Sequence, residues 1–485
     1  MRTVLLVGAA LLPPAVIAGC AERRELPPEP RVATIVQDDA ELLHRSPHRI
    51  ASTLDDLRDL GVDWVRITAG WSVIAPAPTA VRRPQFDATD HGAYPRGAWS
   101  ALDRAVQMAA DRGLRVSIDI AFWAPRWAVG RAGSRPERER DSIDVSDFAD
   151  FSEAVASRYP QAVAFTVWNE PNHPAFMQPQ WEHAHGTWRA ASPHRYRAMV
   201  QAAVPRIKAA APRALVLIGA TSSTGSAAGD RRTAGMAPLT FLREMACVDK
   251  RLRPLDRAEC RSFQPLPGDG WSHHPYSTSL TPSERDPDAA NARMGDLGRL
   301  SSLLARLRAI GRTRTDLPLY LTEYGYQTNP PDPTSRTSLA EQARWLPEAE
   351  QIARRQATVR GVSQFLVRDL PQRTGEDLRS RWGDYQSGLR FADGRPKPAH
   401  AAYALALVAR RADARHVAFW GLVRPGTGAR DARISVLEPD ATWRSLTQLR
   451  TRPDGTFSVK IAVNPSRTFR LQSGSRMGSA LKGAR

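Results

Sequence analysis

The sequence predicts a (β/α)8 TIM barrel followed by a small all-β sandwich domain. Eight apolar, strand-like segments alternate with helix-like segments from about residue 32 to 411, and the hydrophobic periodicity changes to two after about residue 412. The chain of 485 residues is also too long for one ordinary domain. A barrel over residues 32–411 and a sandwich over residues 413–475 therefore divide it naturally.

The expected strands are short apolar runs rich in β-branched and aromatic residues, as in parallel strands that helices cover. They are residues 32–36, 62–68, 114–122, 162–167, 214–220, 271–276, 318–326 and 362–367. Amphipathic helices separate most of them, several bounded by a glycine or by a Ser-Pro start. These helices are residues 52–60, 99–112, 145–158, 192–211, 289–310, 338–355 and 398–410.

The C-terminal part has the period of strands instead. Apolar Phe457, Val459 and Ile461 alternate with more polar neighbours, directly after a Pro-Asp-Gly turn. This pattern predicts the sandwich. Residues 476–485, rich in Gly, Ser and basic side chains, are expected to be a flexible tail.

The N-terminal residues are typical of an export signal. Residues 1–20 contain Arg2 and an apolar stretch too short to span a bilayer. Their ending, VIAGC, resembles the lipobox of bacterial lipoproteins, which implies lipid attachment to Cys20 and an extracytoplasmic, membrane-anchored or secreted protein. The alternative is a plain cleaved signal with Cys20 incidental. Residues 21–31, rich in proline, would form a tether, and Cys247 and Cys260 remain as the single possible disulfide pair.

The formal net charge of +18 raises the question of a nucleic-acid partner. The basic residues are almost all Arg and are scattered through helices and loops, without a basic run interleaved with aromatics. We therefore expect no nucleic-acid partner. An acidic polysaccharide as substrate remains open.

Two strands end in a carboxylate. The fourth strand runs into Trp168–Asn172, WNEPN, which contains Glu170, and the seventh runs into Thr322–Gly325, TEYG, which contains Glu323. A barrel gathers the carboxyl ends of its strands at one mouth. Glycoside hydrolysis needs two such carboxyls, one to protonate the leaving oxygen and one to attack the anomeric carbon.

These two motifs resemble the acid/base and nucleophile motifs of the clan A glycoside hydrolases, most similar to family 39 and to cellulase-like (family 5) members. The resemblance covers roughly residues 32–407. It implies that Glu170 is the general acid/base and Glu323 the nucleophile. It also implies that Asn169 binds the sugar 2-hydroxyl, that Arg66 pairs with the nucleophile, and that His274 and Tyr276 line the same subsite.

Aromatic residues on the loops suggest further sugar contacts. Trp71 and Trp123 fall near the catalytic end, and flat indoles suit the apolar faces of sugars. Clan members commonly end the eighth strand in an aromatic platform, whereas here Phe365–Val367 leads into Arg368. This departure puts the sugar preference in doubt, and Arg368 would favour a carboxylated sugar.

The leading hypothesis is a retaining glycoside hydrolase that cleaves O-glycosidic bonds of an oligo- or polysaccharide through a covalent glycosyl-enzyme. We expect a monomer that uses no cofactor. We also expect no metal, because neither Cys nor carboxylate lies at ligand spacing beside the His273–His274 pair. The alternatives are a non-catalytic carbohydrate-binding surface protein on a barrel scaffold, and an adhesin that holds an acidic wall polymer by charge.

Overall fold

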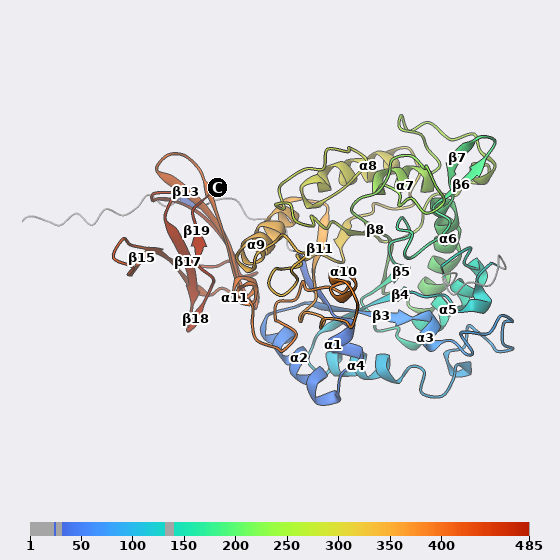
Figure 1. Ribbon diagram of the computed structural model, residues 1–485, viewed down its shortest axis with the longest axis horizontal. Helices are drawn as coiled ribbons and strands as arrows, with labels where there is room; N and C mark the ends of the chain where they lie inside the picture. The colour runs from blue at the N-terminus through green and yellow to red at the C-terminus, as the bar shows by residue number, and fades with distance from the viewer. Residues whose placement is uncertain (1–23, 26–31, 131–139, 485) are drawn as a thin grey trace, which may run out of the picture.

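The computed structural model describes residues 24–25, 32–130 and 140–484, and it contains a barrel beside a smaller β module (Figure 1). The expected signal peptide of residues 1–20, with Cys20, and most of the expected tether lie outside this range. Within it, none of the helices has the length and apolar character needed to cross a membrane.

Eight parallel strands close into a barrel, which confirms the predicted fold. Each predicted strand is present, with its ends shifted by up to five residues, the largest shift being at the end of the seventh strand. In barrel order they are β2 (Ala33–Gln37), β3 (Trp64–Gly70), β4 (Arg115–Ala121), β5 (Ala164–Val167), β8 (Leu215–Ser222), β9 (Gly270–His274), β10 (Leu319–Leu321) and β11 (Val359–Phe365), with β11 pairing back to β2.

Helices surround the barrel and have identifiable start signals. The hydroxyl of Ser338 accepts from the backbone N–H of Glu341 while the Glu341 carboxylate accepts from the Ser338 N–H, a capping box. The Asp144 carboxylate caps another helix by accepting from the backbone N–H groups of Ser146 and Asp147. The helices are α1 (Asp39–Leu43), α2 (Pro47–Asp59), α3 (Trp71–Ile74), α4 (Ser100–Ala110), α5 (Val145–Arg158), α6 (Ser192–Ala210), α7 (Pro238–Met245), α8 (Leu297–Ala309), α9 (Leu339–Arg355), α10 (Leu378–Arg381) and α11 (Pro398–Ala404).

The inside of the barrel is layered. Trp64 on β3 and Tyr320 on β10 stack with ring centroids 5.8 Å apart, and with Ile35 and Leu217 they form an apolar layer. Side chains two positions further along a strand point to the same face. Arg66 therefore follows Trp64 into the interior, one layer nearer the carboxyl ends of the strands, so the apolar layer supports a charged one.

Two antiparallel sheets form the C-terminal module, as predicted. One sheet contains β1 (Arg24–Glu25), β16 (Thr456–Ala462), β13 (His416–Val423) and β12 (Leu405–Arg411). The other contains β14 (Asp431–Leu437), β15 (Trp443–Arg450), β17 (Thr468–Ser473), β18 (Arg476–Met477) and β19 (Leu481–Lys482). Apolar side chains from both sheets, such as Phe419 and Phe469, form the core between them.

Three details of this region differ from the sequence predictions. The helix expected over residues 398–410 ends at Ala404, because the next seven residues pair with β13 as a strand. The prediction of a flexible tail over residues 476–485 was wrong for residues 476–484, because β18 and β19 pair with β17 and Leu481 is buried. Within the expected tether, Arg24 and Glu25 pair with β16.

A two-stranded hairpin and a disulfide lie in the segments that connect the barrel strands. Strands β6 (Trp181–Ala184) and β7 (Thr187–Ala190) form a two-stranded hairpin that the sequence did not suggest. Cys247 and Cys260 are joined in a disulfide, with Cα atoms 5.6 Å apart. The bond closes the excursion between α7 and β9.

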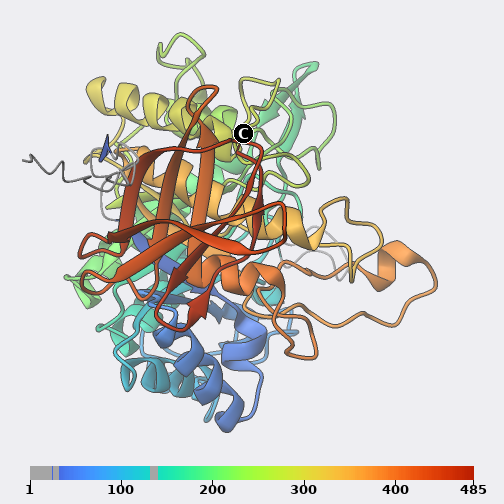
Figure 2. The same ribbon diagram turned by 90° about the vertical axis from the view of Figure 1, so that its left-hand side faces the viewer.

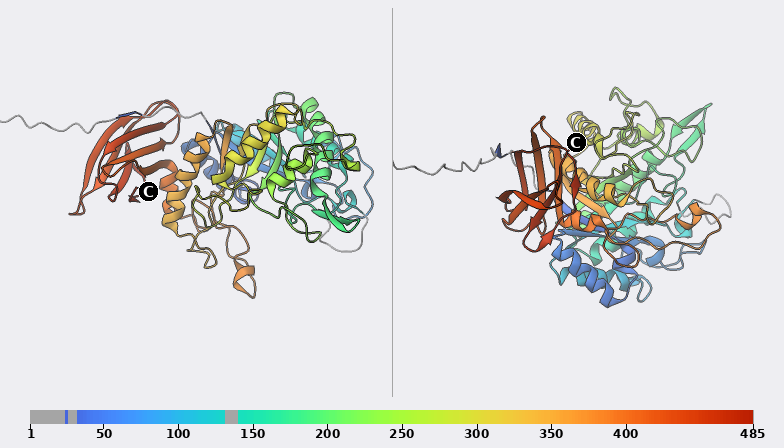
Figure 3. Two further views of the ribbon diagram at one scale, coloured as in Figure 1. Left: turned by 90° about the horizontal axis from the view of Figure 1, so that it is seen from above. Right: turned by 60° about the vertical axis from the view of Figure 1, so that its left-hand side comes forward.

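The four-stranded sheet packs against the barrel. Figures 2 and 3 show the module beside α9 and α11, and these two helices contact β12. Arg424 is almost fully buried there, with Nη2 2.8 and 2.7 Å from the two carboxylate oxygens of Glu350 on α9. Burial alone would raise the pKa of Glu350, but Arg424 and Arg354 outweigh it and lower that pKa. The carboxylate is therefore ionised and bound by two cations.

The Arg424–Glu350 pair predicts a stability effect. Arg424→Ala leaves a buried carboxylate with one partner removed, and such losses typically cost about 3–5 kcal/mol. We expect a fall of this size in the free energy of unfolding, measured by urea denaturation at pH 7. Arg415→Ala, an exposed arginine of the same module, should change it by no more than about 0.5 kcal/mol. Similar effects of the two variants would contradict the role given to this pair.

Candidate active site

The WNEPN segment turns sharply where β5 ends. Trp168 and Glu170 have φ of 60° and 37°, in the left-handed region that costs non-glycine residues on the order of 1–3 kcal/mol each. The Trp168 N–H donates to Ile120 O of β4, and the Glu170 N–H to Ala220 O of β8, each at 2.9 Å. Asn172 then binds the backbone of Ser222 and Met236. Both neighbouring strands thus hold the turn that presents Glu170.

Glu323 follows β10 and is held by two donors. Arg66 Nη1 donates to Glu323 Oε1 at 2.9 Å, and the Tyr276 hydroxyl donates to Oε2 at 3.0 Å. Burial and the nearby carboxylates raise the pKa of Tyr276 well above its usual value, so its hydroxyl keeps its proton. Both oxygens of Glu323 therefore accept a hydrogen bond, which favours the carboxylate form.

Arg66 is fully buried and serves more than one carboxylate. Its Nη2 lies 2.8 Å from Asp119 Oδ1 on β4, and its Nη1 also donates to the side chain of Gln37. Burial raises the pKa of Asp119 to about 7 and Glu323 adds to the rise, although Arg66 opposes it. One guanidinium thus faces two carboxylates in a dry layer, and Asp119 is the one that tends to hold a proton.

His274 connects the two glutamates. Its Nδ1 lies 2.9 Å from Glu170 Oε1 and 3.6 Å from Glu323 Oε2, and its Nε2 lies 3.0 Å from the Thr322 hydroxyl. An ionised Glu170 requires the proton on Nδ1. The hydroxyl of Thr322 can donate or accept, so this partner suits either tautomer of His274.

The neighbouring His273 plays a different part. It is fully buried, and burial lowers its pKa to about 4, so the ring is neutral at pH 7. Its Nε2 faces the Ala292 carbonyl at 2.7 Å and its Nδ1 the Thr221 hydroxyl at 2.9 Å. His273 therefore braces the ends of β8 and β9 rather than taking part in chemistry.

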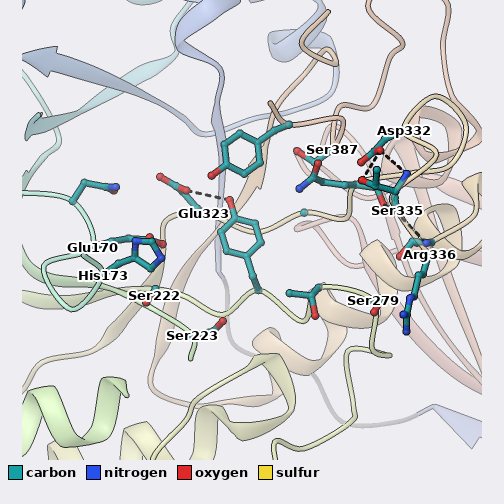
Figure 4. A pocket seen from close by; sticks show the side chains of 18 of the residues that line it. Glu170, His173, Ser222, Ser223, Ser279, Glu323, Asp332, Ser335, Arg336 and Ser387 are labelled. Atoms are coloured by element: carbon teal, nitrogen blue, oxygen red, sulfur yellow. Dashed lines mark hydrogen bonds between the residues drawn. The ribbon is translucent and has the colours of Figure 1, made fainter. Parts of the chain in front are cut away.

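A cavity of about 490 Å3 opens over these groups (Figure 4). In this view Glu170 and His173 lie on one side, Asp332 and Arg336 on the other, and Glu323 between them. The sequence analysis named four of the lining residues, Asn169, Glu170, Tyr276 and Glu323. It missed Phe176, His173, Ser222, Tyr385 and the loop of residues 332–337, which lie at the end of a barrel strand or on the loops after it, where position alone was the available signal.

Two tryptophans predicted to contact the sugar do not line the cavity. Trp71 is fully buried and stacks on Phe151 at 5.6 Å in the helix layer, so the prediction that it binds substrate was wrong. Trp123 stacks on Phe176 at 5.7 Å and lies under the Arg140 guanidinium. Trp123 does not line the cavity itself. Its ring supports Phe176, which does line the cavity.

The end of the eighth strand also departs from expectation. Arg368 lies against Glu41, with Nε 3.5 Å from Oε2, and is outside the described lining of the cavity. Tyr385 instead supplies the aromatic ring at the end of the eighth strand. It lines the cavity and packs edge-on against Phe365, with ring centroids 5.2 Å apart. Tyr385 follows α10, whose loop projects from the barrel (Figure 2).

Two groups of described side chains are close enough to share a metal ion. In the first, His194 faces Cys247 and Cys260, whose sulfurs are bonded to each other. In the second, Glu170, His274 and Glu323 each have an atom within 4.8 Å of the others. Arg66 and Tyr276 already bind Glu323, and the Arg66 charge would oppose a cation there. The second group therefore fits proton transfer better than metal binding.

A sequence-family model described as cellulase, glycosyl hydrolase family 5, matches residues 40–356, more than half of the chain. The chain belongs to this family. The matched residues include Arg66, Asp119, Glu170, His274 and Glu323, the charged and titratable groups at the mouth of the barrel. Its members are glycoside hydrolases, so this family 5 protein is a glycosidase and its substrate is a carbohydrate.

One solved structure agrees with the barrel fold, and two others have lower similarity. A family 39 glycoside hydrolase from Bacteroides cellulosilyticus WH2 is 14% identical, with a TM-score of 0.52 over 92% of this chain and 83% of that one. A family 5, subfamily 18 variant from Streptomyces cattleya in complex with Manb1-4GlcNAc is 19% identical, with a TM-score of 0.47 over 76% and 78%. Endo-glycoceramidase II from Rhodococcus sp. is 15% identical, with a TM-score of 0.43 over 89% and 97%. Among curated proteins, none matches the sequence.

Asp119 predicts a pH-dependent stability. Its folded pKa of about 7 exceeds the usual 3.8, so the folded state binds the proton more tightly. The resulting stability is complete below about pH 4 and is lost progressively as the pH rises from about 4 to 7, on the order of 4 kcal/mol in all. In Asp119→Asn the free energy of unfolding should fall less between pH 4 and 8 than in the parent.

Urea denaturation at several pH values measures this difference. Asp316→Asn, at an exposed aspartate, serves as control and should keep the parent's pH dependence. An unchanged slope in Asp119→Asn would mean that Asp119 is ionised throughout.

Proposed function

We propose that this protein is a retaining glycoside hydrolase in which Glu323 is the nucleophile and Glu170 the general acid/base. The observation that carries the proposal is their proximity, since an oxygen of each lies within 4.8 Å of the other around His274. Retaining enzymes hold their carboxyls about 5–5.5 Å apart, whereas inverting enzymes leave roughly 6.5–9.5 Å for a water molecule. The shorter spacing supports direct attack by Glu323.

The reaction would proceed in two steps. In the first, a Glu323 oxygen forms a bond to the anomeric carbon while Glu170 gives its proton to the departing glycosidic oxygen, whose bond to that carbon breaks. In the second, Glu170 takes a proton from water, and the resulting oxygen displaces Glu323 from the same carbon. Glu170 ends protonated and Glu323 ionised, ready for another cycle.

The neighbours suit these changes of charge. Arg66 and Tyr276 hold Glu323 as a carboxylate before attack and stabilise it as it leaves. His274 can donate from Nδ1 to an ionised Glu170 or accept from the protonated form, so it can accompany Glu170 through both steps.

Asn169 offers a sugar contact. It lines the cavity next to Glu170, and its Oδ1 is buried without a hydrogen-bond partner among the described residues. A buried acceptor left unpaired costs about 1–3 kcal/mol. A hydroxyl at the sugar 2-position would satisfy it, in agreement with the role that the family resemblance implies.

We further propose an oligo- or polysaccharide as substrate. The cavity of about 490 Å3 is large for one sugar ring and extends from Glu170 across to the loop of residues 332–337. A non-catalytic carbohydrate-binding protein is the second candidate. It would have no use for a carboxylate that a fully buried arginine and a tyrosine hydroxyl both contact, which favours the enzyme.

We propose an extracytoplasmic location with a lipid on Cys20. The disulfide between Cys247 and Cys260 supports export, because such bonds persist in oxidising compartments. Mass spectrometry of the mature protein from its native host should find a diacylglyceryl group on an N-terminal cysteine. A mature N-terminus at another residue would remove the anchor.

The mechanism predicts retention of configuration. NMR spectra taken early in hydrolysis of an aryl glycoside should contain the anomer of the substrate before mutarotation. Appearance of the opposite anomer first would contradict direct attack by Glu323.

The two glutamates should respond differently to substitution. Glu323→Gln should reduce turnover by roughly 10^4-fold or more, because no nucleophile remains. Glu170→Ala should impair substrates with poor leaving groups far more than activated aryl glycosides, and added azide should restore turnover by attacking the glycosyl-enzyme. Glu376→Gln, at an exposed loop position, is the control and should be fully active. Full activity of Glu323→Gln would contradict its role as nucleophile, whereas sugar binding without any turnover in the parent would favour the binding-protein alternative.

A further inference from the structure

The C-terminal module carries a disproportionate share of the positive charge. Residues 405–484 contain fourteen Lys and Arg side chains against five Asp and Glu, a formal charge of +9 out of +18 for the whole chain. This segment is about a sixth of the sequence. Charge gathered in so small a part favours binding of a polyanion.

The five-stranded sheet leaves one face uncovered. Ala432, Ile434 and Leu471 point into the core between the sheets, so the residues that alternate with them point outward. The four-stranded sheet lies on the barrel side, where Ala406 and Arg424 are buried beside residues of α9 and α11. The outer face of the five-stranded sheet is therefore the side of the module turned away from the barrel (Figures 1 and 3).

A groove of about 550 Å3 crosses this outer face. Arg433 on β14 lies between Gln448 on β15 and Gln472 on β17, its direct partners across the sheet. Arg450 is the next outward residue of β15 after Gln448. All four line the groove, so guanidinium and amide groups from three strands meet in one row.

Neither Arg433 nor Arg450 forms an ion pair with any carboxylate that the structure describes. Asp431 is the one acidic residue among the described lining, and it lies directly across the sheet from Arg450, so the two arginines outnumber it. The other nearby acid, Glu438, is bound by Arg444 and Arg467. Arg470 adds a third guanidinium on the same face, stacked 4.1 Å above the Trp443 ring.

We propose that this groove binds a carboxylated polysaccharide and holds it beside the catalytic barrel. Arginine matches a carboxylate with two parallel hydrogen bonds, and glutamine amides suit sugar hydroxyls. The choice of a polysaccharide over other polyanions rests on the proposed glycosidase function. A single-stranded nucleic acid needs open aromatic platforms, whereas Arg470 covers the Trp443 ring. A membrane surface needs exposed apolar anchors, and the described groove lining has none.

The test measures binding of the purified full chain to polygalacturonate and to its fully methyl-esterified form, which has the same backbone without the charge. We expect clear preference for polygalacturonate and weaker binding at high salt. Arg433→Gln/Arg450→Gln should lower that affinity by about ten-fold or more. Arg411→Gln/Arg415→Gln, which removes the same charge from exposed positions at the other sheet, should lower it by less than about three-fold.

Several outcomes would overturn the proposal. They are equal affinity for the two polymers, equal losses in the two double variants, or tighter binding of single-stranded DNA or of anionic vesicles through the same arginines. Arg433→Lys, which keeps the charge but loses the paired hydrogen bonds, should bind more weakly than the parent and provides the test if the double variant fails to fold. Hydrolysis of a small aryl glycoside should be unchanged in all variants, so loss of the groove and failure of the glycosidase mechanism are distinguishable.

Discussion

The buried guanidinium of Arg66 is the constraint on which the active site depends. A charge in a dry barrel interior is tolerated only when it is paired and hydrogen-bonded. Glu323, Asp119 and Gln37 supply those partners from three other strands or strand ends. The same contacts fix Glu323 in place, so the barrel cannot satisfy its buried arginine without also positioning the carboxylate that we propose as nucleophile.

The apolar layer beneath Arg66 makes this arrangement possible. Trp64 and Tyr320 fill the barrel below it and exclude water from that side. Because strands alternate with a period of two, each strand that contributes to the filled layer also presents its next inward residue toward the mouth. His274 joins the two carboxylates across this mouth. Packing and chemistry thus occupy successive layers of one barrel.

The C-terminal module contains both a buried, paired arginine and exposed arginines without a carboxylate partner in the described structure. Arg424 is buried and paired with Glu350, and it fixes the module to α9. Arg433 and Arg450 lie on the outer face without a carboxylate partner among the described residues. A buried arginine must find its partner within the chain, whereas an exposed one is free to meet a ligand. The position of each arginine relative to the two sheets therefore separates a structural role from the binding role that we propose.

The sequence by itself determined the barrel, its eight strands, the sandwich and the two strand-end carboxylates that we propose as catalytic, because hydrophobic period, glycine stops and strand-end motifs are local. Only the tertiary structure decided which side chains reach the cavity. Trp71 resembles a sugar platform in sequence, yet helix packing buries it, while Tyr385 enters the cavity from a polar loop. Likewise residues 405–411 became a strand, and the C-terminal end acquired two short ones, because partners far along the chain offered backbone hydrogen bonds. Burial and pairing depend on such distant partners, and no local pattern records them.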